Sequence, residues 1–286
     1  MSPTKTFLEV TINGSNPETC IPALAEIGCR GFLEQGPALV GYFGEESLRP
    51  GESAAGFRER INRAVREVSA EARVDFREVP DRDWNEEWEK SIRPIEIGER
   101  FVVRPSWAPY ENRDQRIVIQ IDPKMSFGTG FHESTRLMMS LLERYVQPGF
   151  SVLDVGTGTG ILAIAAARLG SGRVLGIDND DWSISNSKEN IRANGLEDRI
   201  DISGTPAENL SDLSFNLLAA NLTLNTISEL LPRFHRLLVL NGMLLISGFL
   251  VTDREAMIGR ASSARFFVVD EESENGWLAI AARRLP

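Results

Sequence analysis

Residues 152–162 read Val152-Leu153-Asp154-Val155-Gly156-Thr157-Gly158-Thr159-Gly160-Ile161-Leu162. Apolar residues typical of a buried strand run directly into a turn with three glycines, and a helical pattern begins straight after the turn. Glycine lets the backbone turn sharply and approach a ligand closely, while the start of a helix presents free N–H groups. This order predicts the first unit of a Rossmann-like sheet, with a ligand bound at the turn.

The spacing of the glycines bears on the class of ligand. A dinucleotide fingerprint, G-x-G-x-x-G, needs a small residue where this chain has Ile161, and here the third glycine, Gly160, comes one position early. With Asp154 on the strand, this spacing favours a loop for S-adenosylmethionine over a pyrophosphate cradle. The alternatives of another class are an NAD-binding oxidoreductase and a nucleotide-sensing module without catalysis.

An acidic residue, Asp178, ends the next predicted strand, 173–177. A carboxylate has two acceptor oxygens and can bind both hydroxyls of a ribose, so we predict this role for Asp178. Two more acids follow, Asp180 and Asp181, and either one is a candidate to cap the helix that comes next.

Polar residues at two further places are candidates for the site. Asn221 follows the buried strand 215–220, at the end where open α/β sheets bind ligands. Its amide oxygen could accept a hydrogen bond from a substrate amine, or the residue could cap the helix that begins near Thr223. Upstream, residues 125–136 form a glycine-containing loop that can close over a ligand, in which Thr135 opens or enters a helix. His132 in this loop is a candidate base, although we favour a structural hydrogen-bonding role for it.

Around these motifs the second half of the chain alternates strands with helices. Strands are predicted at 151–155, 173–177, 199–203, 215–220, 243–247, 265–269 and 277–282, and helices at 160–169, 181–194, 224–239 and 253–262. Such alternation is typical of a doubly wound, mostly parallel sheet. The last two strands lie close together in sequence and predict a hairpin.

The first half of the chain has a different pattern. Residues 7–79 read as β-α-β-β-α-β, the order of a ferredoxin-like fold, which by itself assigns no function. A charged segment with a helical pattern follows at 81–91, where Trp84 and Trp88 share one face. Residues 101–104 and 116–121 then predict a pair of strands.

Composition narrows the class of protein. Hydrophobic residues make up 42% and charged residues 25%, as in a globular protein, and the net charge of −10 argues against binding nucleic acid by bulk attraction to phosphates. The start of the chain lacks a signal-peptide core, and the most apolar run, 237–251, is too short to span a membrane. Two cysteines and two histidines predict reduced thiols and no metal site. We therefore expect a cytoplasmic protein.

Taken together, the motifs resemble a known family, the bacterial methyltransferases that act on the eleventh protein of the large ribosomal subunit. The resemblance covers nearly the whole chain. It rests on Asp83-Trp84, Glu87-Trp88, Arg93-Pro94, the strand 101–107, the loop Phe127-Gly128-Thr129-Gly130 with His132-Glu133-Ser134-Thr135, the turn 153–160, Asp178, Ala220-Asn221 and Ser247-Gly248.

The resemblance implies a class I methyltransferase that uses S-adenosylmethionine to trimethylate the N-terminal α-amine and lysine ε-amines of that ribosomal protein. Another protein or a small amine remains the alternative substrate. By position the cofactor contacts are Thr135, Gly156, Asp178 and Asn221, and Asn221 also orients the reacting amine. We add as predicted cofactor contacts the loop residues Phe127, Gly128 and Thr129 and the turn residue Gly158.

The resemblance also implies a division of the chain. Residues 1–80 form a ferredoxin-like domain that recognises the substrate, 81–100 a helical linker, and 101–286 the methyltransferase domain. Two positions depart from the family pattern. Phe131 stands where many relatives have a second histidine, and Asn221 is followed by Leu-Thr rather than the Pro-Pro-aromatic run of other amine methyltransferases.

Overall fold

The computed structural model describes residues 6–14, 17–29, 31–35, 38–44, 47–69, 71–80, 93–122, 126–210 and 214–286. The chain divides into two compact units, Met1–Ser91 and Ile92–Pro286. The helix predicted at 81–91, with Trp84 and Trp88, lies outside the described residues.

The first unit is a four-stranded antiparallel sheet with two helices, and its strand order is β2-β3-β1-β4. Its elements are β1 (Thr6–Asn13), η1 (Pro17–Cys20), α1 (Ile21–Ile27), β2 (Gly31–Gln35), β3 (Ala38–Phe43), α2 (Ala54–Val68) and β4 (Arg73–Pro80). Helix α2 buries Phe57, Ile61 and Val65 because residues four apart share one helix face. The predicted ferredoxin-like fold is confirmed.

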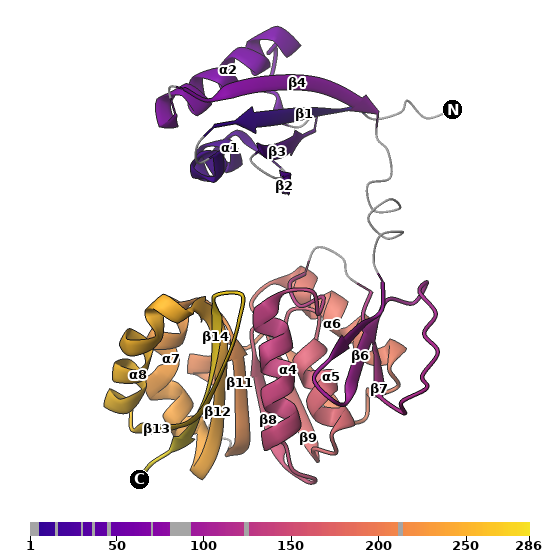
Figure 1. The fold of residues 1–286 in the computed structure, drawn as a ribbon, viewed down its shortest axis with the longest axis vertical. Coiled ribbons are helices and arrows are strands. Elements are labelled where there is room, and N and C mark those ends of the chain that lie inside the picture. The colour runs from indigo at the N-terminus through magenta and orange to yellow at the C-terminus, as the bar shows by residue number, and fades with distance from the viewer. Residues whose placement is uncertain are drawn as a thin grey trace. The chain divides into compact units, whose positions relative to one another are not determined.

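The second unit is built on a seven-stranded sheet of order β10-β9-β8-β11-β12-β14-β13, in which β14 alone runs antiparallel to the rest (Figure 1). The strands are β8 (Ser151–Val155), β9 (Arg173–Ile177), β10 (Ile200–Ser203), β11 (Phe215–Asn221), β12 (Leu238–Leu250), β13 (Phe266–Glu274) and β14 (Trp277–Arg284). The predicted Rossmann-like, mostly parallel sheet is confirmed.

Helices cover both faces of this sheet. One apolar core joins it to α4 (Glu133–Tyr145), α5 (Ile161–Arg168) and α6 (Asp181–Ala193). A second core on the other face joins it to α7 (Leu224–Leu237) and α8 (Arg254–Ser263). Strand order reverses between β8 and β11, so the crevice at their carboxyl ends is where a ligand of an open α/β sheet binds.

A small sheet of β5 (Ile95–Ile97), β6 (Phe101–Arg104) and β7 (Ile117–Gln120) precedes α4. Strand β5 falls within the range 81–100 that we predicted as a helical linker, so the described end of that range is extended rather than helical. Its residues alternate: Ile97 is buried in the core beside α4, and Glu96 is exposed. Tertiary pairing with β6 decides the conformation of this short segment.

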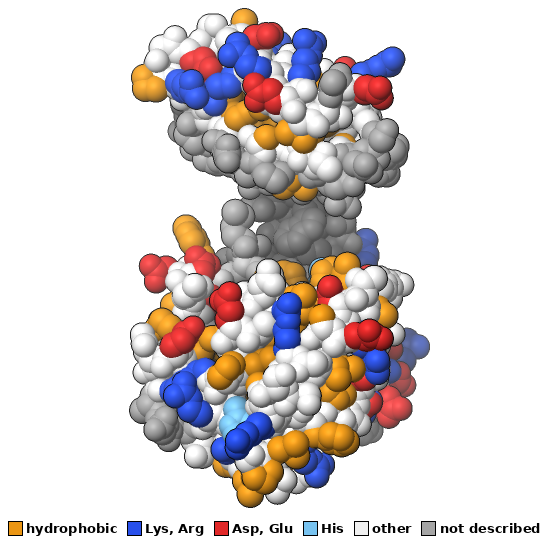
Figure 2. All heavy atoms as spheres, turned by 90° about the vertical axis from the view of Figure 1, so that its left-hand side faces the viewer, with side chains coloured by type: hydrophobic (Ala, Val, Ile, Leu, Met, Phe, Trp, Pro, Cys, Tyr) orange, Lys and Arg blue, Asp and Glu red, His pale blue; other side chains and the backbone are white. Residues whose placement is uncertain are grey.

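The charged residues are interspersed on the face that Figure 2 presents, the side nearest α7 and α8 in Figure 1. Acidic and basic side chains alternate there with hydrophobic ones among the described residues of the second unit. This face therefore lacks the continuous positive field that attracts nucleic acid. Within the described residues, no helix has both the length and the apolar character to cross a membrane.

Candidate functional site

The glycine turn after β8 has a backbone that glycine alone adopts readily, with φ of +72° at Gly156, +54° at Gly158 and +84° at Gly160. Every backbone N–H from residue 156 to 160 donates to an acceptor within the protein. The acceptors are Ile177 O for Gly156 and Thr157 (2.9 and 3.0 Å), Asp178 Oδ2 for Gly158 (2.9 Å), Phe127 O for Thr159 (2.9 Å) and Thr157 O for Gly160 (2.8 Å). A pyrophosphate cradle needs such groups free, so the geometry argues against NAD.

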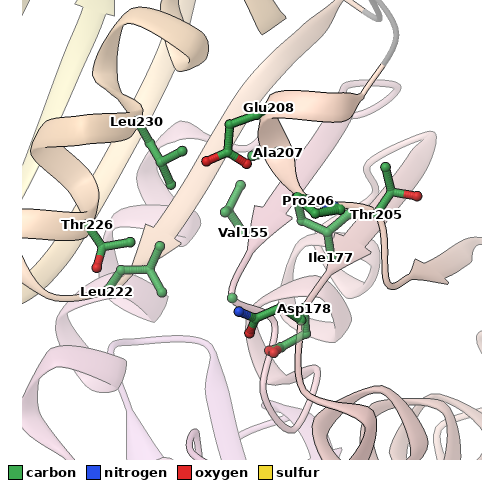
Figure 3. A pocket seen from close by; sticks show the side chains of 12 residues that line it. Val155, Ile177, Asp178, Thr205, Pro206, Ala207, Glu208, Leu222, Thr226 and Leu230 are labelled. Carbon is green, nitrogen blue, oxygen red and sulfur yellow. The ribbon is translucent and has the colours of Figure 1, made fainter.

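Asp178 lies just beyond the end of β9, at the edge of a hollow (Figure 3). Its Oδ2 accepts the Gly158 N–H at 2.9 Å and its Oδ1 accepts the Asp180 N–H at 3.1 Å. A carboxylate has about four lone-pair sites, so acceptor capacity remains for a ligand. Asp180 caps α6 by accepting from Ser183 N, which confirms one of the two capping candidates.

The hollow has a volume of about 180 Å³ and opens to solvent. Its apolar walls are Val155, Ile177, Pro206, Ala207, Leu222 and Leu230. The carboxylates of Asp178 and Glu208 lie toward its two ends (Figure 3). Apolar walls for a flat ring, with acceptors for hydroxyl and amine hydrogens, fit the adenosine half of S-adenosylmethionine.

Several of these lining residues were missed by the sequence analysis. They are Thr205, Pro206, Ala207 and Glu208 after β10, and Leu222, Thr226 and Leu230 after β11. Their position just past the carboxyl ends of parallel strands was the available signal. Gly156 lines the same hollow, and a Cβ there would lie 2.5 Å from Leu222 Cδ2.

The loop before α4 is hydrogen-bonded to the glycine turn. Thr159 donates its N–H to Phe127 O (2.9 Å) and its hydroxyl to Gly128 O (2.5 Å). A Cβ on Gly158 would lie 2.4 Å from Phe127 O, so this approach requires glycine at 158. Thr129 instead accepts a hydrogen bond from Phe131 N within the loop, at 3.4 Å.

The structure brings together two residues that are far apart in sequence. Asn221 ends β11, and its Nδ2 lies 3.5 Å from Oγ1 of Thr135, which is buried in the first turn of α4. The cap of α7 is Thr223, whose side chain accepts from Thr226 N. The alternative interpretation of Asn221 as a helix cap is therefore wrong.

Aromatic rings also meet at the start of α4. His132 caps the helix by accepting the Ser134 N–H on Nδ1, and burial lowers the pKa of its imidazole. Its ring centroid lies 5.3 Å from that of Phe127 and 4.5 Å from that of Trp277. The predicted structural hydrogen-bonding role of His132 is thus confirmed, while Trp277 was not predicted.

Beneath the turn lies a second acid, Asp154, which is fully buried. Thr157 donates its hydroxyl to Asp154 Oδ2 at 2.7 Å. Burial raises the pKa of this carboxyl to about 7, against the lowering effect of the Thr157 hydrogen bond.

Known proteins share both the sequence and the fold. The profile of the ribosomal protein L11 methyltransferase (PrmA) family matches residues 6–285. The chain belongs to this family. The ribosomal protein L11 methyltransferase of Chlorobaculum tepidum is 33% identical over 288 residues, covering 98% of each chain. That of Caldicellulosiruptor saccharolyticus is 35% identical over 254 residues, covering 88% of this chain and 83% of its own.

A solved structure is also similar to this chain in fold and sequence. The ribosomal protein L11 methylase of Lactobacillus delbrueckii subsp. bulgaricus matches with a TM-score of 0.64 and 29% identity, covering 68% of this chain and all (100%) of its own. Family membership confirms the resemblance found in the sequence, the methyltransferase class and S-adenosylmethionine as the cofactor. The NAD-binding and non-catalytic alternatives are set aside.

Changing Asp154 to Asn tests whether the pKa of the buried carboxyl is raised. The folded pKa of about 7 exceeds the ordinary 3.8, so the folded state binds the extra proton between these values. The contribution of Asp154 to stability is full below the lower pKa and is lost as the pH rises to the upper one, by at most about 1.4 kcal/mol per pH unit. The Tm of Asp154→Asn minus that of the wild type should therefore rise between about pH 4 and pH 7 and level off above pH 7. Parallel Tm curves would contradict this.

Proposed function

We propose that the protein transfers methyl groups from S-adenosylmethionine to amines of ribosomal protein L11. The observation that carries the proposal is the family match over residues 6–285, which includes the first unit as well as the Rossmann-like one. A ribosomal substrate implies that the reaction takes place in the cytoplasm. Another protein or a small amine is the alternative substrate.

Within this proposal the adenosine half of the cofactor occupies the hollow. Asp178 accepts hydrogen bonds from the ribose hydroxyls, and Gly156 lets the backbone approach the cofactor closely. At the other end of the hollow, Glu208 accepts a hydrogen bond from a donor group of the cofactor. The predicted contacts Phe127, Gly128, Thr129 and Gly158 belong to the loop and turn that meet above β8. When bound, the cofactor supplies an electrophilic methyl group on a sulfonium.

Asn221 orients the acceptor amine. Donation from its Nδ2 to Thr135 Oγ1 leaves the amide oxygen Oδ1 to accept an N–H of the substrate. The amine then presents its lone pair in a fixed direction, and positioning of this kind accounts for much of the rate of a group transfer.

The acceptors we propose are the N-terminal α-amine and lysine ε-amines. A lysine attacks only as the free amine, so its ammonium must first lose a proton. An apolar surrounding lowers the pKa of an ammonium, and the rings of His132 and Trp277, which pack edge to face at the start of α4, supply part of such a surrounding. Water can accept the released proton.

The first unit would recognise the protein substrate. It has its own buried core, and the hollow is lined by residues of the second unit. We propose a recognition domain at 1–80 and a linker that ends before β5, because the second unit begins at Ile92 and the methyltransferase domain therefore starts before residue 101.

The proposed activity is tested by the intact mass of L11 after incubation with the protein and S-adenosylmethionine. We expect gains in whole methyl increments. Asp178→Ala should weaken cofactor binding by roughly tenfold to a hundredfold, because hydrogen bonds to a charged group contribute about 1.5–3 kcal/mol. No gain in mass with intact cofactor binding would redirect the search to another amine.

Asn221→Ala tests the orienting role. The variant should reduce kcat by roughly tenfold to a hundredfold while the Tm stays near the wild-type value, because a misplaced nucleophile slows the transfer step. Single-turnover methylation and calorimetry measure these quantities. An unchanged kcat would remove Asn221 from the mechanism.

Deleting residues 1–80 tests the division of labour. Methylation of L11 should fall below detection while calorimetry still shows cofactor binding, because the hollow belongs to the second unit. Circular dichroism reports whether the truncated chain is folded. Loss of cofactor binding in a folded truncation would contradict the assignment.

A further inference from the structure

The tip of the β13–β14 hairpin meets the first turn of α4. The tip residues Asn275 and Gly276 have φ of +48° and +85°, as in the two-residue type I′ turn that Asn-Gly favours. Gly276 O accepts a hydrogen bond from Val251 N at 2.8 Å, just beyond the end of β12. The tip is therefore fixed at the same edge of the sheet where Asn221 lies.

Arg136, in the first turn of α4, contacts both the hairpin and the loop. Its Nε and Nη2 donate to the carboxylate of Glu274, with distances of 2.7 to 3.1 Å, and its Nη1 donates to the carbonyl of Phe131. The Arg136 side chain is only 18% exposed, so water screens the ion pair less than on an open surface. The planar fork of a guanidinium suits a carboxylate and a carbonyl at once.

Two neighbouring contacts also join the start of α4 to the hairpin. Glu133 accepts a hydrogen bond from Asn275 Nδ2 at 3.1 Å, and the His132 ring packs against Trp277. The other end of the loop, at Phe127, is bonded to the glycine turn through Thr159. The loop thus spans from the cofactor side of the site to the hairpin, and Arg136 bonds its far end.

We propose that Arg136 is a positioning residue, which fixes the end of the loop and the hairpin tip relative to Thr135 and Asn221 and so shapes the site of the acceptor amine. The nature of that acceptor rests on the proposed function. Among the described residues that line the hollow, none bonds to Arg136. Its loss should therefore leave the walls of the hollow in place and act through the loop, Thr135 and Asn221.

The chain offers a matched control on the same helix. Arg144 pairs with Asp270 (2.6 Å) and Glu272 of β13, so it also joins α4 to that strand. It lies two turns further along α4, and its described bonds go to β13 rather than to the loop. If Arg136 contributed to stability alone, replacing Arg136 and replacing Arg144 would have the same effect on the kinetics.

The kinetic experiment compares Arg136→Gln with Arg144→Gln. For Arg136→Gln we expect kcat/KM for L11 to fall by about tenfold or more. Arg144→Gln should lower the Tm similarly and keep wild-type kinetics. Glu274→Gln should reproduce the kinetic loss, and adding it to Arg136→Gln should cause little further loss. Equal kinetics in the two arginine variants would overturn the proposal.

Hydrogen exchange supplies a second readout that needs no activity. Amides at 127–132 and 275–277 should exchange about tenfold faster in Arg136→Gln than in the wild type, and at the wild-type rate in Arg144→Gln. Equal exchange in both variants would refute the positioning role. If the wild type adds no methyl group to L11, the proposed function fails, and the exchange comparison alone decides the role of Arg136.

Discussion

The hydrogen bonds of the glycine turn are the constraint on which the rest of the site depends. Because the N–H groups of residues 156–160 all donate within the protein, the turn has its shape without a ligand. That shape requires positive φ at three glycines and leaves no space for a Cβ between Gly158 and Phe127 O. Strand β9 and the loop before α4 are thereby joined to the end of β8, and the end of β9 forms one wall of the hollow.

The same turn separates the roles of two carboxylates. Asp154 is buried beneath it and bonded to Thr157, where desolvation favours the neutral form. Asp178 lies at the rim of the hollow, where two backbone N–H groups donate to its oxygens. The two acids thus differ in environment, because one faces the packed interior and the other the open edge of the sheet.

The first turn of α4 contacts the loop before it, the end of β11 and the β13–β14 hairpin, and so connects these three parts of the molecule. Successive residues of a helix point in directions about 100° apart, so neighbours in sequence reach different partners. His132 caps the helix and meets Trp277, Thr135 approaches Asn221, and Arg136 bonds Glu274 and the loop. This is the physical basis for assigning a positioning role to a residue that lines no part of the hollow.

The sequence by itself determined the order of the strands and helices, the two fold types, and the candidates Gly156, Asp178 and Asn221. Periodicity and turn residues report local burial, and the binding edge of an α/β sheet follows from its strand order. The tertiary structure alone decided that Thr223 rather than Asn221 caps α7, that Ile95–Ile97 is a strand, and that Glu208 and Trp277 flank the site. These outcomes depend on contacts between segments far apart in the chain, and no local pattern specifies such contacts.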